Sequence, residues 1–200
     1  MARLISRRHT LGLPLALAAS AYIGHSTGAA AATSTTTNEA AIPATRFYPG
    51  RNGRRGLVVY LDGDGQELHD SDGDDTSPIP GGLAGADGIV GAATSRGYDV
   101  LSVRTPSKDR KWWSGDNVNY LTDTIQREST KHASTLDQLW LIGYSGGSEL
   151  ITQSFFPQYA ESMKAGGFLV FGGGNAPEDQ TGVSFSTQAR STFSLNWVTG

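Results

Sequence analysis

A serine between glycines is the residue of this sequence best placed to do chemistry. It lies in the segment Gly143–Gly147, which reads Gly-Tyr-Ser-Gly-Gly. The apolar run Leu139–Ile142 comes directly before this segment and predicts a buried strand, and the residues from Ser148 onward predict a helix. A serine at the apex of such a turn is held in a strained backbone shape that lifts its hydroxyl clear of the sheet. We therefore predict that Ser145 is a nucleophile.

The neighbouring glycines suit both the turn and the chemistry. The residues two before and two after the serine must be small to avoid collision, and Gly143 and Gly147 meet that condition. The turn would aim the Gly146 N–H and the positive end of the helix dipole at an oxyanion formed beside Ser145. The alternative is a glycine-rich loop whose serine does nothing, because the chain holds 26 glycines.

The strand, turn and helix around Ser145 resemble the nucleophile elbow of the α/β-hydrolase family. The resemblance covers roughly residues 56 to 200. It implies an α/β fold, with a mostly parallel sheet and helices on both faces, whose last strands are missing from this chain. It also implies a serine hydrolase that cleaves carboxylic esters through an acyl-enzyme and needs no cofactor or metal.

The family takes a second oxyanion donor from the loop after an earlier strand. Here the apolar run Gly56–Leu61 leads into Asp-Gly-Asp-Gly. We expect the backbone N–H of Asp64 to be this donor, with Gly63 shaping the turn. Asp62 replaces the histidine that the family often has and brings negative charge toward the site. A simple connecting loop is the alternative.

The resemblance also calls for an acid and then a histidine after the nucleophile. The chain has four histidines, and all precede the serine: His9, His25, His69 and His132. We therefore expect the triad acid and histidine to lie beyond Gly200, and this chain alone to show negligible turnover. Glu178 and Asp179 could supply the acid, although a solvated loop is the simpler interpretation. His69 could approach from the first loop, against the family's order.

Three aromatic residues are predicted to line the substrate site. Trp112 and Trp113 follow the second predicted strand, at the same edge of the sheet as the serine, and Tyr144 directly precedes the serine. Their rings could line a pocket for an acyl chain or a sugar, or could simply pack.

The segment Asp70–Asp75 partly imitates a calcium-binding loop. It lacks the glycine and the glutamate that such a loop needs at its sixth and twelfth positions, where Asp75 and Gly81 stand. We expect a solvated acidic insertion and no metal site.

The rest of the chain predicts alternating strands and helices. The expected strands are 56–62, 98–103, 139–142, 168–171 and 193–198, and the expected helices are 83–96, 117–132 and 148–156. Asp116 or Asn117 is expected to cap the second helix, and Pro157 to break the third. Strands separated by single helices give a parallel sheet, whose binding sites lie at the carboxyl ends of its strands.

Composition narrows the functional classes further. The 200 residues allow one domain, and the absence of cysteine excludes disulfides, thiolate metal sites and a cysteine nucleophile. The formal net charge is −3 and becomes −6 without the first 32 residues, which hold three arginines and no acid. A nucleic-acid partner is not expected, because phosphate binding needs clustered basic residues.

The first 32 residues predict a secretory signal peptide. They have a basic start, an apolar run from Leu11 to Ile23 and small residues at 29–32. The paired arginines Arg7 and Arg8 resemble a twin-arginine export signal. An uncleaved anchor is the alternative, but the apolar run is short for a membrane span. Residues 33–44 are expected to be a flexible lead-in, and 45–200 the hydrolase domain.

Two classes of function remain open at this point. The first is an exported enzyme, secreted or in the cell envelope, that acts on a small-molecule, lipid or sugar ester; a cell-envelope acyltransferase is its close chemical relative. The second is a non-catalytic binding protein on the same fold, because a fold alone does not fix function. No stable membrane span is expected after cleavage of the signal.

Overall fold

The computed structural model describes residues 44–71, 83–85, 87–113, 116–176 and 184–198. The predicted signal peptide, nearly all of the lead-in, most of the acidic insertion, Glu178 and Asp179 lie outside these residues. Within them, no helix has the length and apolar character that crossing a membrane requires.

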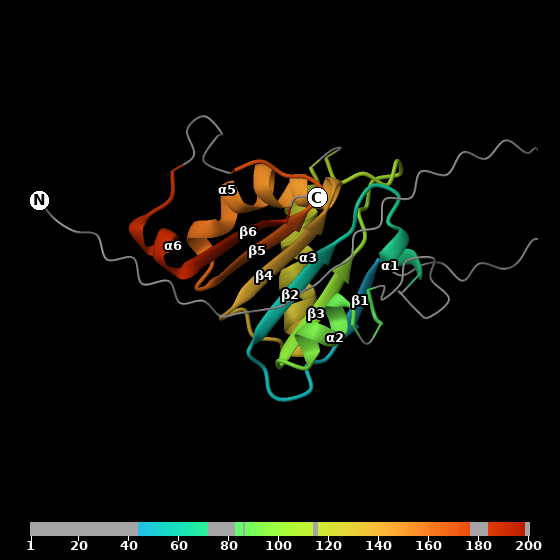
Figure 1. Cartoon of the computed structure of the whole chain (residues 1–200), viewed down its shortest axis with the longest axis horizontal. Coiled ribbons are helices and arrows are strands. Elements are labelled where there is room, and N and C mark those ends of the chain that lie inside the picture. Colours follow the sequence, from blue (N-terminus) through green and yellow to red (C-terminus); the bar gives the residue numbers. More distant parts are fainter. Residues whose placement is uncertain (1–43, 72–82, 86, 114–115, 177–183, 199–200) are drawn as a thin grey trace, which may run out of the picture. The chain divides into compact units, whose positions relative to one another are not determined.

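A six-stranded sheet forms the centre of the described chain (Figure 1). Its strands are β1 (Thr45–Tyr48), β2 (Gly56–Leu61), β3 (Tyr98–Val103), β4 (Leu139–Tyr144), β5 (Gly166–Phe171) and β6 (Phe193–Val198). They lie in the order β1-β3-β2-β4-β5-β6, and all neighbours are parallel except β1, which pairs antiparallel with β3. The five predicted strands are confirmed. Strand β1 was not predicted, because four half-buried residues at the sheet edge carry no clear alternation.

The helices differ from the prediction more than the strands do. They are α1 (Glu67–Ser71), α2 (Ile89–Thr94), α3 (Asn117–His132), α4 (Gly146–Leu150), a π-helical turn η1 (Ile151–Phe155), α5 (Phe156–Tyr159), a 3₁₀ turn η2 (Ala160–Ser162) and α6 (Thr187–Thr192). Helix α3 has the predicted bounds. Helix α2 is far shorter than 83–96, because glycines interrupt that segment and weaken a helix. Helices α1 and α6 were not predicted.

Two local predictions about helix ends were wrong. Asp116 occupies the N-cap position of α3 but makes no capping bond, and the Asn117 side chain instead donates to the Trp112 carbonyl at 2.9 Å. Pro157 does not break the helix after β4. It lies in the first turn of α5, and the preceding π-helical turn η1 widens the helix, so the missing proline N–H is accommodated.

The sheet buries a hydrophobic cluster on each face. The larger cluster lies under α3 and the α4–α5 segment and draws on alternate residues of the central strands, such as Leu57, Leu101, Leu141 and Phe168. The smaller cluster lies under α2 and is built on Val58, Tyr60 and Val100. Helices on both faces of a mostly parallel sheet confirm the predicted fold class.

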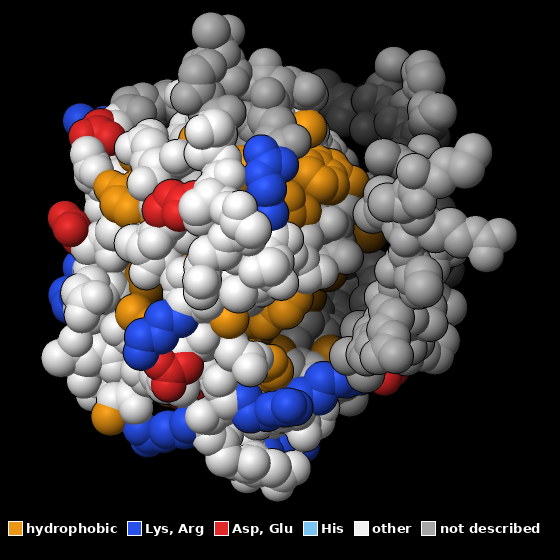
Figure 2. Space-filling model, turned by 90° about the vertical axis from the view of Figure 1, so that its left-hand side faces the viewer, with side chains coloured by type: hydrophobic (Ala, Val, Ile, Leu, Met, Phe, Trp, Pro, Cys, Tyr) orange, Lys and Arg blue, Asp and Glu red, His pale blue; other side chains and the backbone are white. Residues whose placement is uncertain are grey.

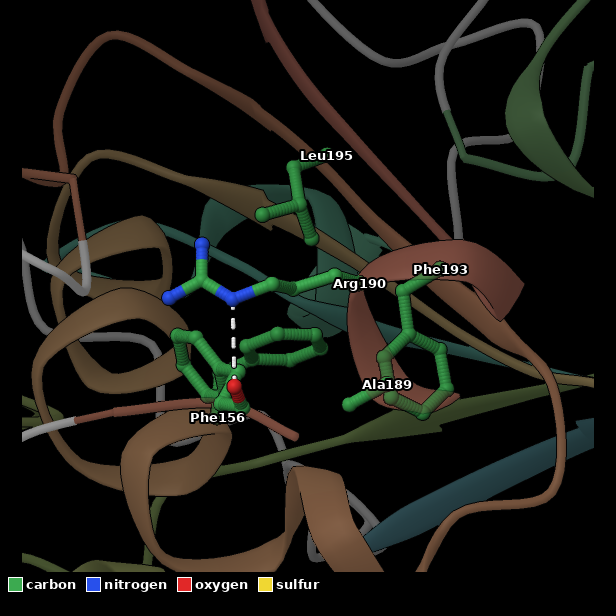
Figure 3. A pocket seen from close by; sticks show the side chains of 6 residues that line it. Phe156, Ala189, Arg190, Phe193 and Leu195 are labelled. Atoms are coloured by element: carbon green, nitrogen blue, oxygen red, sulfur yellow. Dashed lines mark hydrogen bonds between the residues drawn. The ribbon is translucent and has the colours of Figure 1, made fainter. Parts of the chain in front are cut away.

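The β6 side of the sheet is more exposed than its centre, and hydrophobic side chains reach the surface there among polar ones (Figure 2). A hollow of about 290 Å³ opens there between α5, α6 and β6. Arg190 extends across it, and its Nε donates to the Phe185 carbonyl at 3.1 Å (Figure 3). The hollow is lined by Phe193 and Leu195 from the first residues of β6. It therefore lies away from the carboxyl ends of the strands.

Candidate active site

Ser145 occupies a sharp turn between β4 and α4. Its backbone angles, φ 46° and ψ −117°, belong to no regular element and are unusual for a residue with a side chain. Strand β4 ends at Tyr144 and helix α4 begins at Gly146, so one residue makes the whole change of direction. The Ser145 side chain is partly exposed, and its hydroxyl has no hydrogen-bond partner among the described residues. The predicted bend is therefore present, and the hydroxyl is accessible.

The flanking glycines are sterically required. A Cβ on Gly143 would stand 2.7 Å from the Ser148 backbone nitrogen, and a Cβ on Gly147 would stand 2.3 Å from the Leu61 carbonyl oxygen. Both distances are below any ordinary contact, and both neighbours are backbone atoms. The turn is thus wedged between its own helix and the end of β2, which leaves no room for relaxation.

The backbone of Ser145 is held by the neighbouring strand and by its own helix. Its N–H donates to the Phe171 carbonyl at the end of β5 at 3.0 Å, and its carbonyl accepts from the Glu149 N–H at 3.1 Å. These bonds hold the strained angles in place, as a stored strain requires.

The loop after β2 is organised by a buried carboxylate. Asp62 is 3% exposed. Its oxygens accept hydrogen bonds from the Tyr60 hydroxyl and the Gly63 N–H, both at 2.9 Å, and from the Leu68 N–H at 2.7 Å. The His69 N–H adds a longer bond of 3.3 Å. Burial, and then the charge of Asp62, raises the pKa of the Tyr60 phenol well above its usual range, so the phenol stays protonated and donates.

The negative charge that we expected Asp62 to bring toward the site is matched by hydrogen bonds within the loop. Its carboxylate is turned into the loop, where it binds the amides at the start of α1. It fixes the shape of the segment that carries Gly63 and Asp64, which is a positioning role.

The two loops that carry the expected oxyanion donors touch one another. A Cβ on Gly63 would stand 3.3 Å from the Cβ of Ser145, and a Cβ on Gly146 would stand 3.9 Å from the amide nitrogen of Asp64. Neither the Asp64 nor the Gly146 N–H donates a hydrogen bond to another residue in the described part of the chain. The structure thus brings Ser145, Gly146, Gly63 and Asp64 together, as the sequence predicted, with both amides unused. Their role as oxyanion donors stays a prediction.

The three aromatic residues predicted to line the site have different environments in the structure. Trp112 is fully buried in the larger core cluster, so its indole packs in the core and does not face solvent at the site. Trp113 is 58% exposed, with the Lys111 ammonium 4.8 Å from its ring centre. Tyr144 is 46% exposed, and its ring lies against Gly63 and Gly172 on either side of the elbow. Tyr144 therefore borders the candidate site.

Both described histidines are engaged elsewhere. His69 is fully buried, and its Nδ1 lies 2.8 Å from the Ser102 hydroxyl inside the protein. His132 ends α3 at the amino edge of the sheet, where its ring stacks on Phe47 at 3.7 Å and its Nε2 lies 3.6 Å from Glu128. Within the residues that the structure describes, neither histidine is placed as a general base for Ser145.

Asp70, the first residue of the acidic insertion, forms ion pairs with arginines. Asp70 pairs with Arg104 at 3.4 Å and with Arg110. Over the described ranges, no cluster of three or more histidine and acidic side chains is arranged to hold a metal. The rest of the calcium-like segment lies outside those ranges.

One part of the site was not predicted. The loop after β5 packs on the elbow: a Cβ on Gly173 would stand 2.8 Å from the Ser145 carbonyl oxygen, and the Asn175 N–H donates to the Thr152 hydroxyl at 3.2 Å. The signal was the run Gly172–Asn175 directly after a predicted strand, at the edge where parallel sheets place their sites.

No protein-family model matches the chain, and no curated protein matches it. Several solved structures are similar to it, among them the following three. Its identity to YahD, solved with malic acid, is 13% with a TM-score of 0.46, over 78% of this chain and 88% of YahD. For an acetyl xylan esterase from Aspergillus awamori the identity is 15% and the TM-score 0.47, over 78% of this chain and 65% of the esterase, less than two thirds of its length. For a Bacillus cereus carboxylesterase the identity is 14% and the TM-score 0.48, over 76% of this chain and 83% of the carboxylesterase. The fold class of this chain rests on its own strand order and parallel pairing.

Proposed function

We propose that this protein is a serine hydrolase that cleaves carboxylic esters through an acyl-enzyme on Ser145. The observation that carries the proposal is the backbone of Ser145, held at φ 46° and ψ −117° between a strand and a helix with its hydroxyl accessible. Strain of this kind persists where the surrounding structure enforces it, and it concentrates at functional sites.

The reaction begins with attack of the Ser145 oxygen on the acyl carbon. The carbonyl oxygen becomes an oxyanion, which accepts hydrogen bonds from the N–H groups of Gly146 and Asp64. The alcohol then leaves with a proton, the acyl group stays on Ser145, and water releases it as a carboxylic acid. Losing one oxyanion donor typically costs about 100- to 1,000-fold in turnover, so this pair is expected to supply much of the rate.

A general base must take the proton of Ser145, because a serine hydroxyl is a weak nucleophile at its ordinary pKa. His69 and His132 are committed to Ser102 and to Phe47 and Glu128. We therefore place the proton acceptor outside the described residues.

The substrate is a small-molecule, lipid or sugar ester, and the protein acts after export, in the cell envelope or outside the cell. The accessible hydroxyl and the exposed Tyr144 ring beside it support an open site that a small ester could enter. The basic and apolar start of the sequence supports export.

The test is covalent labelling by a neutral fluorophosphonate, followed by intact mass and peptide mapping. The Ser145 oxygen is expected to bond to phosphorus with loss of fluoride, adding one label per chain. Ser145→Ala should abolish the label, and Ser162→Ala, at an exposed serine in η2, should keep it. A folded full-length protein that takes no label, or takes it at another residue, overturns the proposal.

A further inference from the structure

A free carboxylate stands beside the candidate nucleophile. Asp64 is exposed in the loop between β2 and α1. Its Oδ1 lies 2.6 Å from the point that a Cβ on Gly146 would occupy, so the carboxylate rests directly against the residue after Ser145. The same loop is pressed onto the elbow through Gly63. The charge of Asp64 is therefore close to the place where an oxyanion would form.

This charge is not compensated by the surroundings that the structure describes. No hydrogen bond or ion pair joins the Asp64 carboxylate to another described residue. Two other acids of this region are matched: Asp62 accepts four hydrogen bonds, and Asp70 is paired with two arginines. Among these acids, Asp64 is the one that contacts the residue after Ser145 and has no partner in the described part of the chain.

A carboxylate at this place works against the chemistry of a neutral ester. Two like charges about 5 to 6 Å apart, in a setting between protein surface and water, repel by an amount that changes a rate about tenfold. A cation bound beside the carboxylate removes that penalty and adds attraction of similar size. The carboxylate therefore favours one charge type of substrate.

An exposed aromatic side chain, Tyr144, lies on the other side of Ser145 in the sequence. The Tyr144 ring is 46% exposed, and its Cδ1 lies 2.8 Å from where a Cβ on Gly63 would stand. A cation over an exposed aromatic ring gains attraction from the ring face. Tyr144 ends β4 directly before Ser145, and the Asp64 carboxylate rests against Gly146 directly after it, so an exposed ring and an exposed carboxylate flank the nucleophile. Such a pair is a suitable setting for an ammonium group.

We propose that the Asp64 carboxylate, together with the exposed Tyr144 ring that also borders Ser145, selects esters that carry a quaternary or protonated ammonium group near the scissile carbonyl. The proposal rests on the proposed ester hydrolysis and adds its substrate class. Neutral esters react more slowly, and anionic esters most slowly. The Asp64 N–H still serves the oxyanion, while its side chain sets specificity.

The test uses three fluorophosphonates of equal length, whose arms end in trimethylammonium, tert-butyl or carboxylate. All three transfer phosphorus to Ser145 with loss of fluoride, so only the arm differs. The second-order labelling rates of the full-length protein should fall in that order, by about tenfold at each step. In Asp64→Asn the three rates should converge to within about threefold, because the removed charge made the difference. Asp123→Asn, the same change on the exposed side of α3, should keep the wild-type order.

A measurement on the unaltered protein provides a second route. Raising the salt concentration from about 0.02 to 0.5 M should shrink the preference for the trimethylammonium probe, because salt screens an exposed charge. If Ser145 is labelled at the same rate whatever the charge of the arm, the specificity proposal alone is overturned. The same holds if Asp64→Asn keeps the wild-type order of rates. Absence of Ser145 labelling with every probe overturns the proposed function, and the specificity proposal falls with it.

Discussion

The polar side chains at the two edges of the sheet differ in whether they have hydrogen-bond or ion-pair partners. At the amino edge, acids are matched locally: Asp99 accepts from the Gly50 N–H at 2.8 Å and the Ser134 hydroxyl at 2.6 Å, and Asp137 pairs with Lys164. At the carboxyl edge, the Ser145 hydroxyl and the Asp64 carboxylate have no partner among the described residues. Within the described residues, the strained Ser145 turn and an unpartnered hydroxyl and carboxylate thus lie together at the carboxyl edge, where a ligand would supply the missing contacts.

The largest effect on stability is expected from a steric clash at the carboxyl edge. Gly147→Ala would place a methyl group 2.3 Å from the Leu61 carbonyl oxygen, so β2 and the elbow cannot keep their spacing. We expect a loss of about 3 kcal/mol in the free energy of unfolding, measured with urea. Gly53→Ala, at a φ of 102° with open space around it, should lose only about 1 kcal/mol through backbone strain. Equal losses at the two sites would show that the elbow is not wedged.

The next effect tests the buried acids, one at each edge. Asp62 and Asp99 are both 3% exposed, and both bind backbone N–H groups. Either change to asparagine should cost about 2 kcal/mol in urea unfolding, because a buried donor loses a charged acceptor. Only Asp62→Asn should also slow fluorophosphonate labelling of Ser145, since Asp62 shapes the loop beside it. Slowed labelling in Asp99→Asn as well would mean that labelling reports overall stability.

How far the sequence could predict these features depends on the range of the interactions. The elbow was predictable because its constraint is local: Gly143 and Gly147 must be small whatever surrounds them. The central strands β2, β4 and β5 were predictable because a buried parallel sheet needs mainly apolar runs. Neighbouring Trp112 and Trp113 could not be told apart, since only tertiary packing buries one and exposes the other.

The same reasoning explains the other differences from prediction. Pro157 reads as a helix breaker, but the π-helical turn before it depends on how that segment packs on the sheet. Asp62 has the sequence position of a site residue, and its inward direction follows from hydrogen bonds to Leu68 and His69, which lie in the unpredicted α1. The missing signal was tertiary in each case.

A smaller effect of opposite sign tests the strain itself. Ser145→Gly should raise the free energy of unfolding by about 1 kcal/mol, because glycine adopts φ 46° and ψ −117° without penalty. It should also abolish labelling. Ala133→Gly, at the left-handed C-cap of α3 with φ 52°, should stabilise by a similar amount and keep labelling. A Ser145→Gly variant no more stable than the original protein would remove the case for stored strain.

The smallest effect concerns charge at the amino edge. Burial opposes ionisation of Glu128, yet hydrogen bonds from Lys131 and Arg127 hold its pKa below the ordinary value of 4.5. Because the folded-state pKa is the lower one, the ion pairs contribute fully above pH 4.5 and are lost as the pH falls through the folded-state value. Glu128→Gln should therefore cost about 0.5 kcal/mol at neutral pH and nothing in strong acid, measured by urea unfolding against pH. Asp137→Asn, whose salt bridge is exposed, should change stability little at either pH. If the loss of stability in Glu128→Gln did not depend on pH, the loss would come from packing and not from charge. The ion pairs of Glu128 would then contribute nothing to stability.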